Sequence, residues 1–175
     1  TLYAIDQSRN RSKAVEEFQL DGRPFALCTL HRAENTDHEP RLRLILDAVA
    51  REAQGMPIVF PVHPRTRRAM ADGGLALPGS IPVDPLGYFD FHRLLTSCEL
   101  VLTDSGGVQK EAYFHRKPCV TLRDETEWVE TIDAGWNRLW TSPRWNSPRV
   151  EIDDYGRGDA AGTIVSTLIE QLPLL

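Results

Sequence analysis

The feature that most constrains this chain is a strand, a glycine turn and a helical pattern in direct succession within residues 98–122. The apolar run Leu100–Leu102 leads into Thr103-Asp104-Ser105-Gly106-Gly107, and a helical pattern and a second apolar run follow. A turn of this kind points unpaired backbone N–H groups at a helix N-terminus, where the helix dipole favours an anion. The segment therefore predicts a phosphate-binding turn.

The position of Glu111 extends this interpretation from phosphate to nucleotide. Glu111 follows Gly107 by one helical turn, which is about 6 Å along the axis at roughly 1.5 Å per residue. A carboxylate there can accept hydrogen bonds from ribose hydroxyls, so the pattern indicates a nucleoside diphosphate. The same residues also fit a Ser105 that only N-caps the helix and a Glu111 that is a solvated surface acid. The G-x-G-x-x-G and Walker A patterns are absent, so neither a dinucleotide site nor a P-loop is indicated.

Short apolar runs alternate with helical patterns along the chain, as expected for βα units around a parallel sheet. The sequence predicts strands at about 24–30, 57–62, 80–83, 99–103 and 118–122, with a weaker one at 137–140. It predicts helices at about 39–54, 65–72, 88–97, 107–115, 126–134 and 159–171, with a loop over 141–158. Asp124 with Glu127 forms a capping-box pattern, and Gly135 occupies the place of a C′ glycine. We expect an α/β fold, a Rossmann-like three-layer parallel sheet.

Bulk properties exclude several classes of protein. A chain of 175 residues suffices for one well-cored domain, and its net charge of −5 argues against a general nucleic-acid or membrane surface. The first residues lack both an initiator Met and the apolar core of a signal peptide, so the chain reads as a segment of a longer one. Three cysteines without C-x-x-C spacing favour buried reduced thiols in a cytoplasmic protein, and no residue set has metal-ligand spacing. These cysteines are Cys28, Cys98 and Cys119.

Polar clusters follow four of the predicted strands. The carboxyl ends of parallel strands face a common crevice, so these clusters should converge on one site. Each cluster alone also fits an ordinary loop, and coincidence at four strand ends favours the functional interpretation. The clusters are His31-Arg32-Ala33-Glu34-Asn35, His63-Pro64-Arg65, Asp104-Ser105-Gly106-Gly107 and Arg123-Asp124.

His31 is the strongest candidate for catalysis, because imidazole can move a proton or donate to an oxyanion near neutral pH. Glu34, three residues on, would share a helical face with His31 and orient it. Arg32 offers two donors to a phosphate or carboxylate, and it equally fits a structural bridge to Glu34 or Asp37. The other three histidines, which are His38, His92 and His115, have no partner that the sequence reveals.

Aromatic residues lie where a base and a sugar would be expected. Tyr88, Phe89 and Phe91 open the helix before the Ser-Gly-Gly turn and can face a planar base, although rings there also fit packing onto the sheet, which we favour for Phe89. Trp128 fits either a sugar contact or the core.

Taken together, these motifs resemble the C-terminal half of the non-hydrolysing UDP-N-acetylglucosamine 2-epimerases, in order and spacing over nearly the whole chain. The segment from Lys110 and Arg123 to Glu130 is closer to a branch that includes epimerases of UDP-2,3-diacetamido-glucuronic acid, and many members carry arginine where Trp128 stands. The motifs are His31-Arg32-x-Glu34-Asn35, His63-Pro64-Arg65, Pro85-Leu86-x-Tyr88, Asp104-Ser105-Gly106-Gly107-Val108-Gln109-x-Glu111 and Arg123-Asp124-x-Thr126-Glu127.

The resemblance implies a site and a reaction. Ser105 and Gly107 would hold the diphosphate, Glu111 the ribose and Phe91 the uracil region, while His63 would be a candidate for an effector contact. Family members eliminate UDP to a 2-acetamidoglucal and add it back with C2 inverted, without a redox cofactor. The expected catalytic residues are His31 and Glu34, and the expected substrate-binding residues are Arg32, His63, Arg65, Phe91, Ser105, Gly106, Gly107, Glu111 and Arg123.

The resemblance also implies one half of a GT-B-like two-domain fold and a homodimer of the full-length protein. Residues 1–20 would be an interdomain linker or helix, and residues 21–175 the C-terminal nucleotide-binding domain, with the N-terminal catalytic domain absent. We therefore expect this chain alone to be inactive and to expose an apolar face. A GT-B glycosyltransferase domain and a nucleotide-sugar sensor without turnover remain as alternatives.

Overall fold

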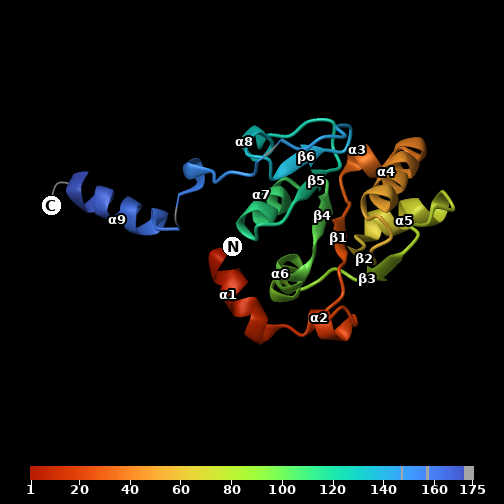
Figure 1. Cartoon of the computed structure of the whole chain (residues 1–175), viewed down its shortest axis with the longest axis horizontal. Helices are drawn as coiled ribbons and strands as arrows, with labels where there is room; N and C mark the ends of the chain where they lie inside the picture. The colour runs from red at the N-terminus through yellow and green to blue at the C-terminus, as the bar shows by residue number, and fades with distance from the viewer. Residues whose placement is uncertain (147, 157, 172–175) are drawn as a thin grey trace.

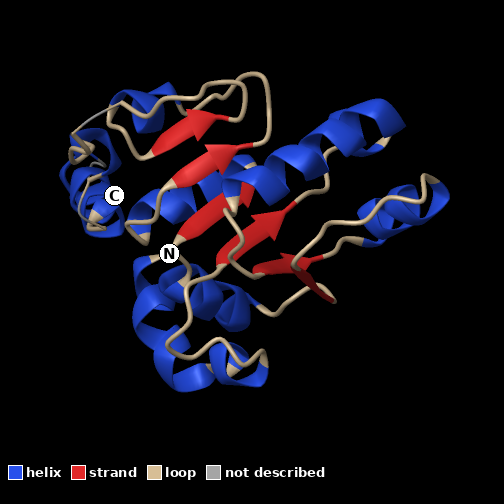
Figure 2. Cartoon of the chain, turned by 45° about the vertical axis from the view of Figure 1, so that its right-hand side comes forward, coloured by secondary structure: helices blue, strands red, loops and turns tan. Residues whose placement is uncertain are grey.

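In the computed structural model, which describes residues 1–146, 148–156 and 158–171, the chain forms a six-stranded sheet with helices on both faces (Figures 1 and 2). The strand order is β3-β2-β1-β4-β5-β6, and every neighbouring pair is parallel. The expected Rossmann-like three-layer fold and its strands, the weak sixth included, are therefore confirmed. The strands are β1 (Ala26–Thr29), β2 (Ile58–Pro61), β3 (Ser80–Val83), β4 (Leu100–Thr103), β5 (Cys119–Thr121) and β6 (Asn137–Leu139).

The central strands are continuously apolar because both of their faces are covered. In β1, Ala26 and Cys28 point into a core beneath α4 (Glu39–Glu52) and α5 (Pro64–Asp72), whereas Leu27 points into a core on the opposite face. The second core lies beneath α2 (Ala14–Glu17), α6 (Tyr88–Ser97) and α7 (Gly106–Phe114). All three cysteines are buried and unpaired, as expected.

The helices expected from the sequence are present, with one boundary error. The helix α8 spans Val129–Asp133 and begins later than the expected residue 126. The Asp124–Glu127 capping box is wrong: Trp128 is the N-cap without a side-chain cap bond, and Glu127 instead accepts from Arg123. The C′ glycine is confirmed, since Gly135 has a φ of 76° and its N–H bonds Ile132 O at 2.9 Å.

Two helices lie within residues 1–20, the segment expected to be a linker or helix, and the other elements that the sequence did not indicate are short. The helix α1 (Leu2–Arg11) packs with α2 against α6, and Val15 and Leu20 belong to the core on that face. These short elements are the helix α3 (Ala33–Thr36) and a 3-10 turn at Asp153–Tyr155. Residues 147 and 157 of the expected loop, and residues 172–175 of the expected domain, lie outside the described part.

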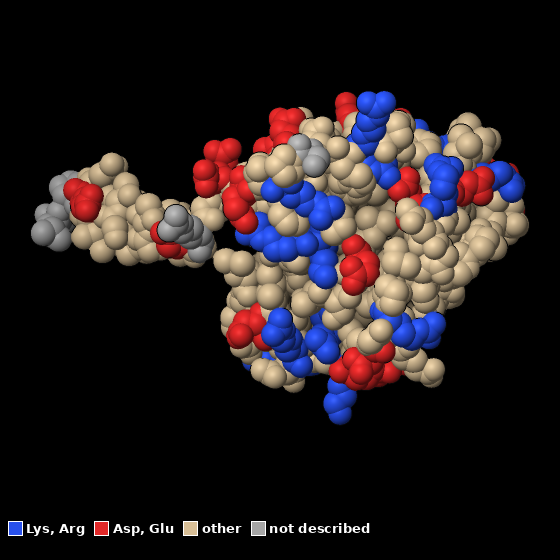
Figure 3. Space-filling model, viewed as in Figure 1, with Lys and Arg blue, Asp and Glu red and all other residues tan. Residues whose placement is uncertain are grey.

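The last helix, α9 (Ala160–Gln171), projects away from the body of the molecule (Figure 1). None of its residues is buried, and the projecting part carries little charge (Figure 3). Its exposed apolar residues recur at helical spacing: Ile164, Val165, Leu168 and Ile169. No helix in the described ranges is both long and apolar enough to cross a membrane.

Candidate functional site

The candidate site lies where the strand order reverses, between β1 and β4. In an open parallel sheet, the connections after these two strands leave in opposite directions and open a crevice at the carboxyl ends. His31 follows β1, and Asp104 and Ser105 follow β4. The register pairs Thr29 with Thr103, so the two segments begin at the same level of the sheet.

Asp104 ties the two segments together. Its carboxylate is fully buried and accepts the backbone N–H groups of His31 at 3.0 Å and Arg32 at 2.8 Å. It also lies 3.2 Å from Nδ1 of His31 and accepts from Nδ2 of Asn35 at 3.2 Å. Burial alone would raise the pKa of Asp104, but the hydrogen bonds from the His31 ring and from these N–H groups outweigh burial and lower it.

The same contact orients the His31 ring and changes its acidity. The hydrogen bond to Asp104 raises the pKa of His31 above its ordinary value, while partial burial opposes the change. Because Nδ1 faces Asp104, Nε2 is the ring nitrogen left for a ligand. The expectation that Glu34 orients His31 is therefore wrong, and Asp104 takes this role from the neighbouring strand.

Asn35 extends the connection to a third strand. Its side chain is buried, donates to Leu122 O just after β5 at 2.8 Å and accepts from Nε of Arg41 at 2.9 Å. The segments after β1, β4 and β5 are thus held as one rigid rim.

The turn after β4 has the geometry of an anion site. Ser105 is the N-cap of α7, its Oγ accepts from Val108 N at 3.5 Å, and its own N–H bonds Oγ1 of Thr103 at 3.0 Å. A Cβ added at Gly106 would lie 2.3 Å from Oε1 of Glu127, whereas one at Gly107 would meet only Oγ of Ser105 at 3.9 Å. Gly107 is exposed, and the first helical turn carries backbone N–H groups that can donate to an anion.

Four of the expected site residues line one cavity of about 260 Å³ at this rim, namely His31, His63, Phe91 and Ser105. The rings of His31 and His63 lie 6.3 Å apart between centroids. The remaining lining is largely apolar and suits a planar ring: Thr29, Leu30, Pro61, Pro85, Leu86 and Val108.

Three expected residues, Arg32, Glu34 and Arg123, form an ion cluster with Glu127 beside Gly106. Nη1 of Arg123 donates to Glu127 at 2.6 Å, and its Nε lies 3.5 Å from Oε1 of Glu34. Arg32 faces Glu127 at 4.0 Å, so its expected bridge to Glu34 or Asp37 is wrong. Glu127 lies beside Gly106 at the N-terminal end of α7. The pKa of Glu127 is lowered by a hydrogen bond from its own backbone and by the hydrogen bond from Arg123.

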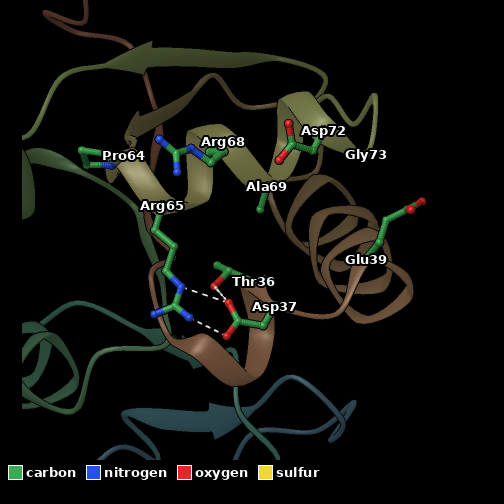
Figure 4. Close-up of a pocket in the computed structure, with 9 residues that line it drawn as sticks. All are labelled: Thr36, Asp37, Glu39, Pro64, Arg65, Arg68, Ala69, Asp72 and Gly73. Atoms are coloured by element: carbon green, nitrogen blue, oxygen red, sulfur yellow. Dashed lines mark hydrogen bonds and ion pairs between the residues drawn. The ribbon is translucent and has the colours of Figure 1, made fainter.

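Arg65 lies apart from the cavity. It pairs with Asp37, with Nε 3.0 Å from Oδ1, across a groove of about 710 Å³ between α3, α4 and α5 (Figure 4). Arg68 and Asp72 also line this groove, which is open and mixed in charge. Although this groove is larger than the cavity at the rim, it does not bring together the other expected site residues.

Glu111 lies one turn along α7, at the contact with α6. Its side chain is 27% exposed, and Oε1 lies 3.7 Å from Nε2 of the fully buried His92. His92 in turn contacts His115, so two histidines that the sequence left without partners form a pair. Neither this pair nor the contact between Asp104 and His31 was predicted from the sequence, where only the position of Asp104 directly after a buried strand offered a signal. In the described ranges, no group of three metal-ligating side chains is close enough to hold a metal ion.

Comparison with known proteins agrees with this geometry. A family model described as UDP-N-acetylglucosamine 2-epimerase matches residues 2–169. A UDP-2,3-diacetamido-2,3-dideoxy-D-glucuronate 2-epimerase of Pseudomonas aeruginosa is 46% identical over 156 residues, covering 82% of this chain and 44% of that protein.

Solved structures give the same result. The UDP-GlcNAc 2-epimerase of Methanocaldococcus jannaschii superposes with a TM-score of 0.79 at 32% identity, covering 95% of this chain and 52% of that one. Its complex with UDP-GlcNAc and UDP superposes with a TM-score of 0.76 at 31% identity, covering 97% and 51% of the two chains. This chain therefore spans about half the length of these relatives.

Proposed function

This chain belongs to the UDP-N-acetylglucosamine 2-epimerase family, and on that premise we propose that it is the UDP-binding half of an enzyme that inverts C2 of a UDP-2-acetamido sugar. The observation that carries the proposal is the cavity shared by His31, His63, Phe91 and Ser105 at the reversal of strand order. The diphosphate would lie on the first turn of α7, the uracil against Phe91 and the ribose against Glu111.

The reaction needs a base at C2 and stabilisation of the departing UDP. A base removes the C2 proton, the C–H electron pair forms the C1=C2 bond, and UDP leaves with the electron pair of the C1–O bond. UDP then adds back to C1 while C2 receives a proton on the opposite face. His31, held by Asp104 and more basic than an ordinary histidine, would place positive charge beside the leaving diphosphate.

The sugar is proposed to be UDP-N-acetylglucosamine or a diacetamido-uronate analogue. The 46% identity to the Pseudomonas aeruginosa protein supports the second choice. Trp128 stands beside the α7 N-terminus, with Nε1 3.3 Å from a Cβ built on Gly106, and would border the sugar.

The domain arrangement is part of the proposal. Residues 21–175 would form the C-terminal domain, and residues 1–20 would lead into it from an N-terminal catalytic domain. The exposed apolar residues of α9 support contact with a further part of the protein. We also propose a homodimer of the longer protein and, from the three buried unpaired thiols, a reducing compartment such as the cytoplasm.

The test is solvent exchange at C2. The longer protein that contains this chain is incubated in D₂O with UDP-N-acetylglucosamine or the diacetamido-uronate analogue, without any acceptor. Deuterium at C2 together with the C2 epimer supports the proposal, whereas unchanged substrate from both sugars contradicts it. Residues 1–175 alone are expected to bind UDP weakly and to give no epimer, because closure of two domains is needed to exclude water.

A further inference from the structure

A chain of buried polar side chains runs beneath Glu111 between α6 and α7. Nδ1 of His92 lies 2.8 Å from Nε2 of His115, and Nδ1 of His115 lies 2.9 Å from Oγ1 of Thr96. The Thr96 hydroxyl also lies 2.9 Å from the backbone carbonyl oxygen of His92. His92 is fully buried and His115 is 7% exposed, so each of these contacts must be a satisfied hydrogen bond.

The contacts determine which atom donates and which accepts in each of these hydrogen bonds. A carbonyl oxygen only accepts, so the single hydroxyl proton of Thr96 goes to the His92 carbonyl. Oγ1 of Thr96 then accepts from His115, which places the His115 proton on Nδ1 and leaves its Nε2 as an acceptor. His92 must therefore donate from Nδ1, and a neutral His92 carries a lone pair on Nε2.

The lone pair of His92 faces the carboxyl group of Glu111. Nε2 is buried, has no hydrogen-bond partner and lies 3.7 Å from Oε1. An ionised Glu111 would bring two acceptors face to face, whereas a protonated Glu111 supplies the missing donor after a small approach. Without a ligand, the lone pair of His92 therefore favours the protonated form of Glu111.

The charged groups around the pair agree with this assignment. Burial raises the pKa of Glu111. Burial lowers the pKa of His92 to about 4 and that of His115 to about 3, so both rings are neutral near pH 7. His92 and Lys117 also disfavour charge on His115.

We infer that His92 is a positioning residue of the nucleoside site, which keeps a proton on Glu111 until a ribose diol replaces it. This inference rests on the proposed function, in which Glu111 accepts hydrogen bonds from the ribose. When the diol binds, its hydroxyl groups donate to the carboxylate oxygens, and Glu111 releases its proton to solvent. Recognition of the diol is thus coupled to the loss of one proton.

The first test needs no ligand. The carboxyl carbon of Glu111 is titrated by NMR in the wild-type chain and in His92→Asn, whose Nδ2 can still donate to His115 but which has no lone pair facing Glu111. The Glu111 pKa is expected to fall in the variant toward the ordinary value of about 4.3. An unchanged Glu111 pKa would overturn the inference. The ¹⁵N shifts of His92 in the wild type provide a measurement that needs no variant, because a proton on Nε2 would also overturn it.

The second test measures the coupling. The affinities of UDP and 2′,3′-dideoxy-UDP are compared as a ratio across pH, which cancels the titration of His31 and of the phosphates. In the wild type the ratio should fall by up to about tenfold per pH unit below the Glu111 pKa. In His92→Asn the fall should begin at lower pH, and a ratio independent of pH in the wild type would contradict the coupling.

The control for lost stability is Ile45→Val, which removes a methyl group from the core on the opposite face of the sheet. It should leave both the Glu111 titration and the pH profile of the ratio unchanged, and a shift as large as that of His92→Asn would overturn the specific role of His92. Failure of UDP to bind at any pH would refute the proposed function and the coupling with it, while the ligand-free titration still decides whether His92 holds the proton.

Discussion

Oδ1 of Asp104 lies 3.2 Å from Nδ1 of His31, and this contact joins the segments after β1 and β4 across the reversal of strand order. The catalytic candidate on one strand is thus oriented by the carboxylate that precedes the anion turn on the other. His31 and Ser105 line the same cavity, so a ligand bound at that turn would face the imidazole.

Asp104→Asn is expected to destabilise the chain by about 2 kcal/mol, because an amide nitrogen would face backbone donors in a fully buried position. The pKa of His31 should fall in the same variant, since its main raising contact is lost. Urea unfolding and NMR titration of His31 measure the two effects. Asp84→Asn is the control, because that side chain is 92% exposed and its change should stay within about 0.5 kcal/mol.

His31→Asn in the longer protein should lower kcat by roughly 10²- to 10⁴-fold, the usual contribution of a general acid or base, and leave UDP affinity largely intact. Steady-state epimerisation and UDP titration separate the two quantities. The exposed N-cap residue His38, whose side chain makes no cap bond, supplies the control His38→Asn. Equal losses of turnover in both variants would remove His31 from the mechanism.

The buried pair of His92 and His115 should make the chain sensitive to acid. Burial lowers the pKa of these groups to about 4 and about 3 from 6.5, so their contribution to stability is full above pH 6.5 and is lost as the pH falls toward 4. The slope should approach about 1.4 kcal/mol per pH unit for each proton taken up on unfolding. Urea midpoints measured across this range test it, and the double variant His92→Leu with His115→Leu should flatten the curve.

Gly106→Ala and Gly107→Ala should differ although the residues are neighbours in one helix. Alanine at Gly107 has open space and should stabilise α7 by about 0.5–1 kcal/mol. Alanine at Gly106 must displace Glu127 from its hydrogen bond with Arg123, so we expect no gain there. Chemical denaturation of both variants gives the comparison, and an equal gain would show that the Glu127 contact is dispensable.

The apolar residues of α9 should contribute little to the stability of this chain. Leu168→Lys with Ile164→Lys should change the free energy of unfolding by less than about 0.5 kcal/mol, because both side chains are exposed. Binding of an apolar dye should fall in the same variant. Leu94→Ala, at a fully buried position, should cost about 2–5 kcal/mol and provides the contrast.

The sequence predicted the strands and most helices, because their signals are local. Continuous apolar runs predicted strands covered on both faces. Gly135 predicted the end of α8, because glycine readily adopts the positive φ found there. The start of α8 was misplaced because the Glu127 side chain accepts a hydrogen bond from Arg123 and does not form the capping box with Asp124. The convergence of His31, His63 and Ser105 followed from one rule of parallel sheets, and the shared cavity agrees with it.

The sequence did not predict side-chain contacts between residues that lie far apart in the chain. His31 was assigned to Glu34 because the two are close in the chain, but the acid that holds it is Asp104, 73 positions away from it. The sequence offered no signal for the contact between His92 and His115, because it depends on the packing of α6 against α7.

The amino-acid sequence by itself determined the alternation of strands and helices and the strand–turn–helix at Ser105, since hydrophobic period, caps and glycines act over a few neighbouring residues. Only the tertiary structure decided which carboxylate orients His31, which arginines are paired with acids and which lone pair faces Glu111. The physical reason is that a buried polar group needs a partner, and the strand order and helix packing decide which distant residue is close enough to provide it.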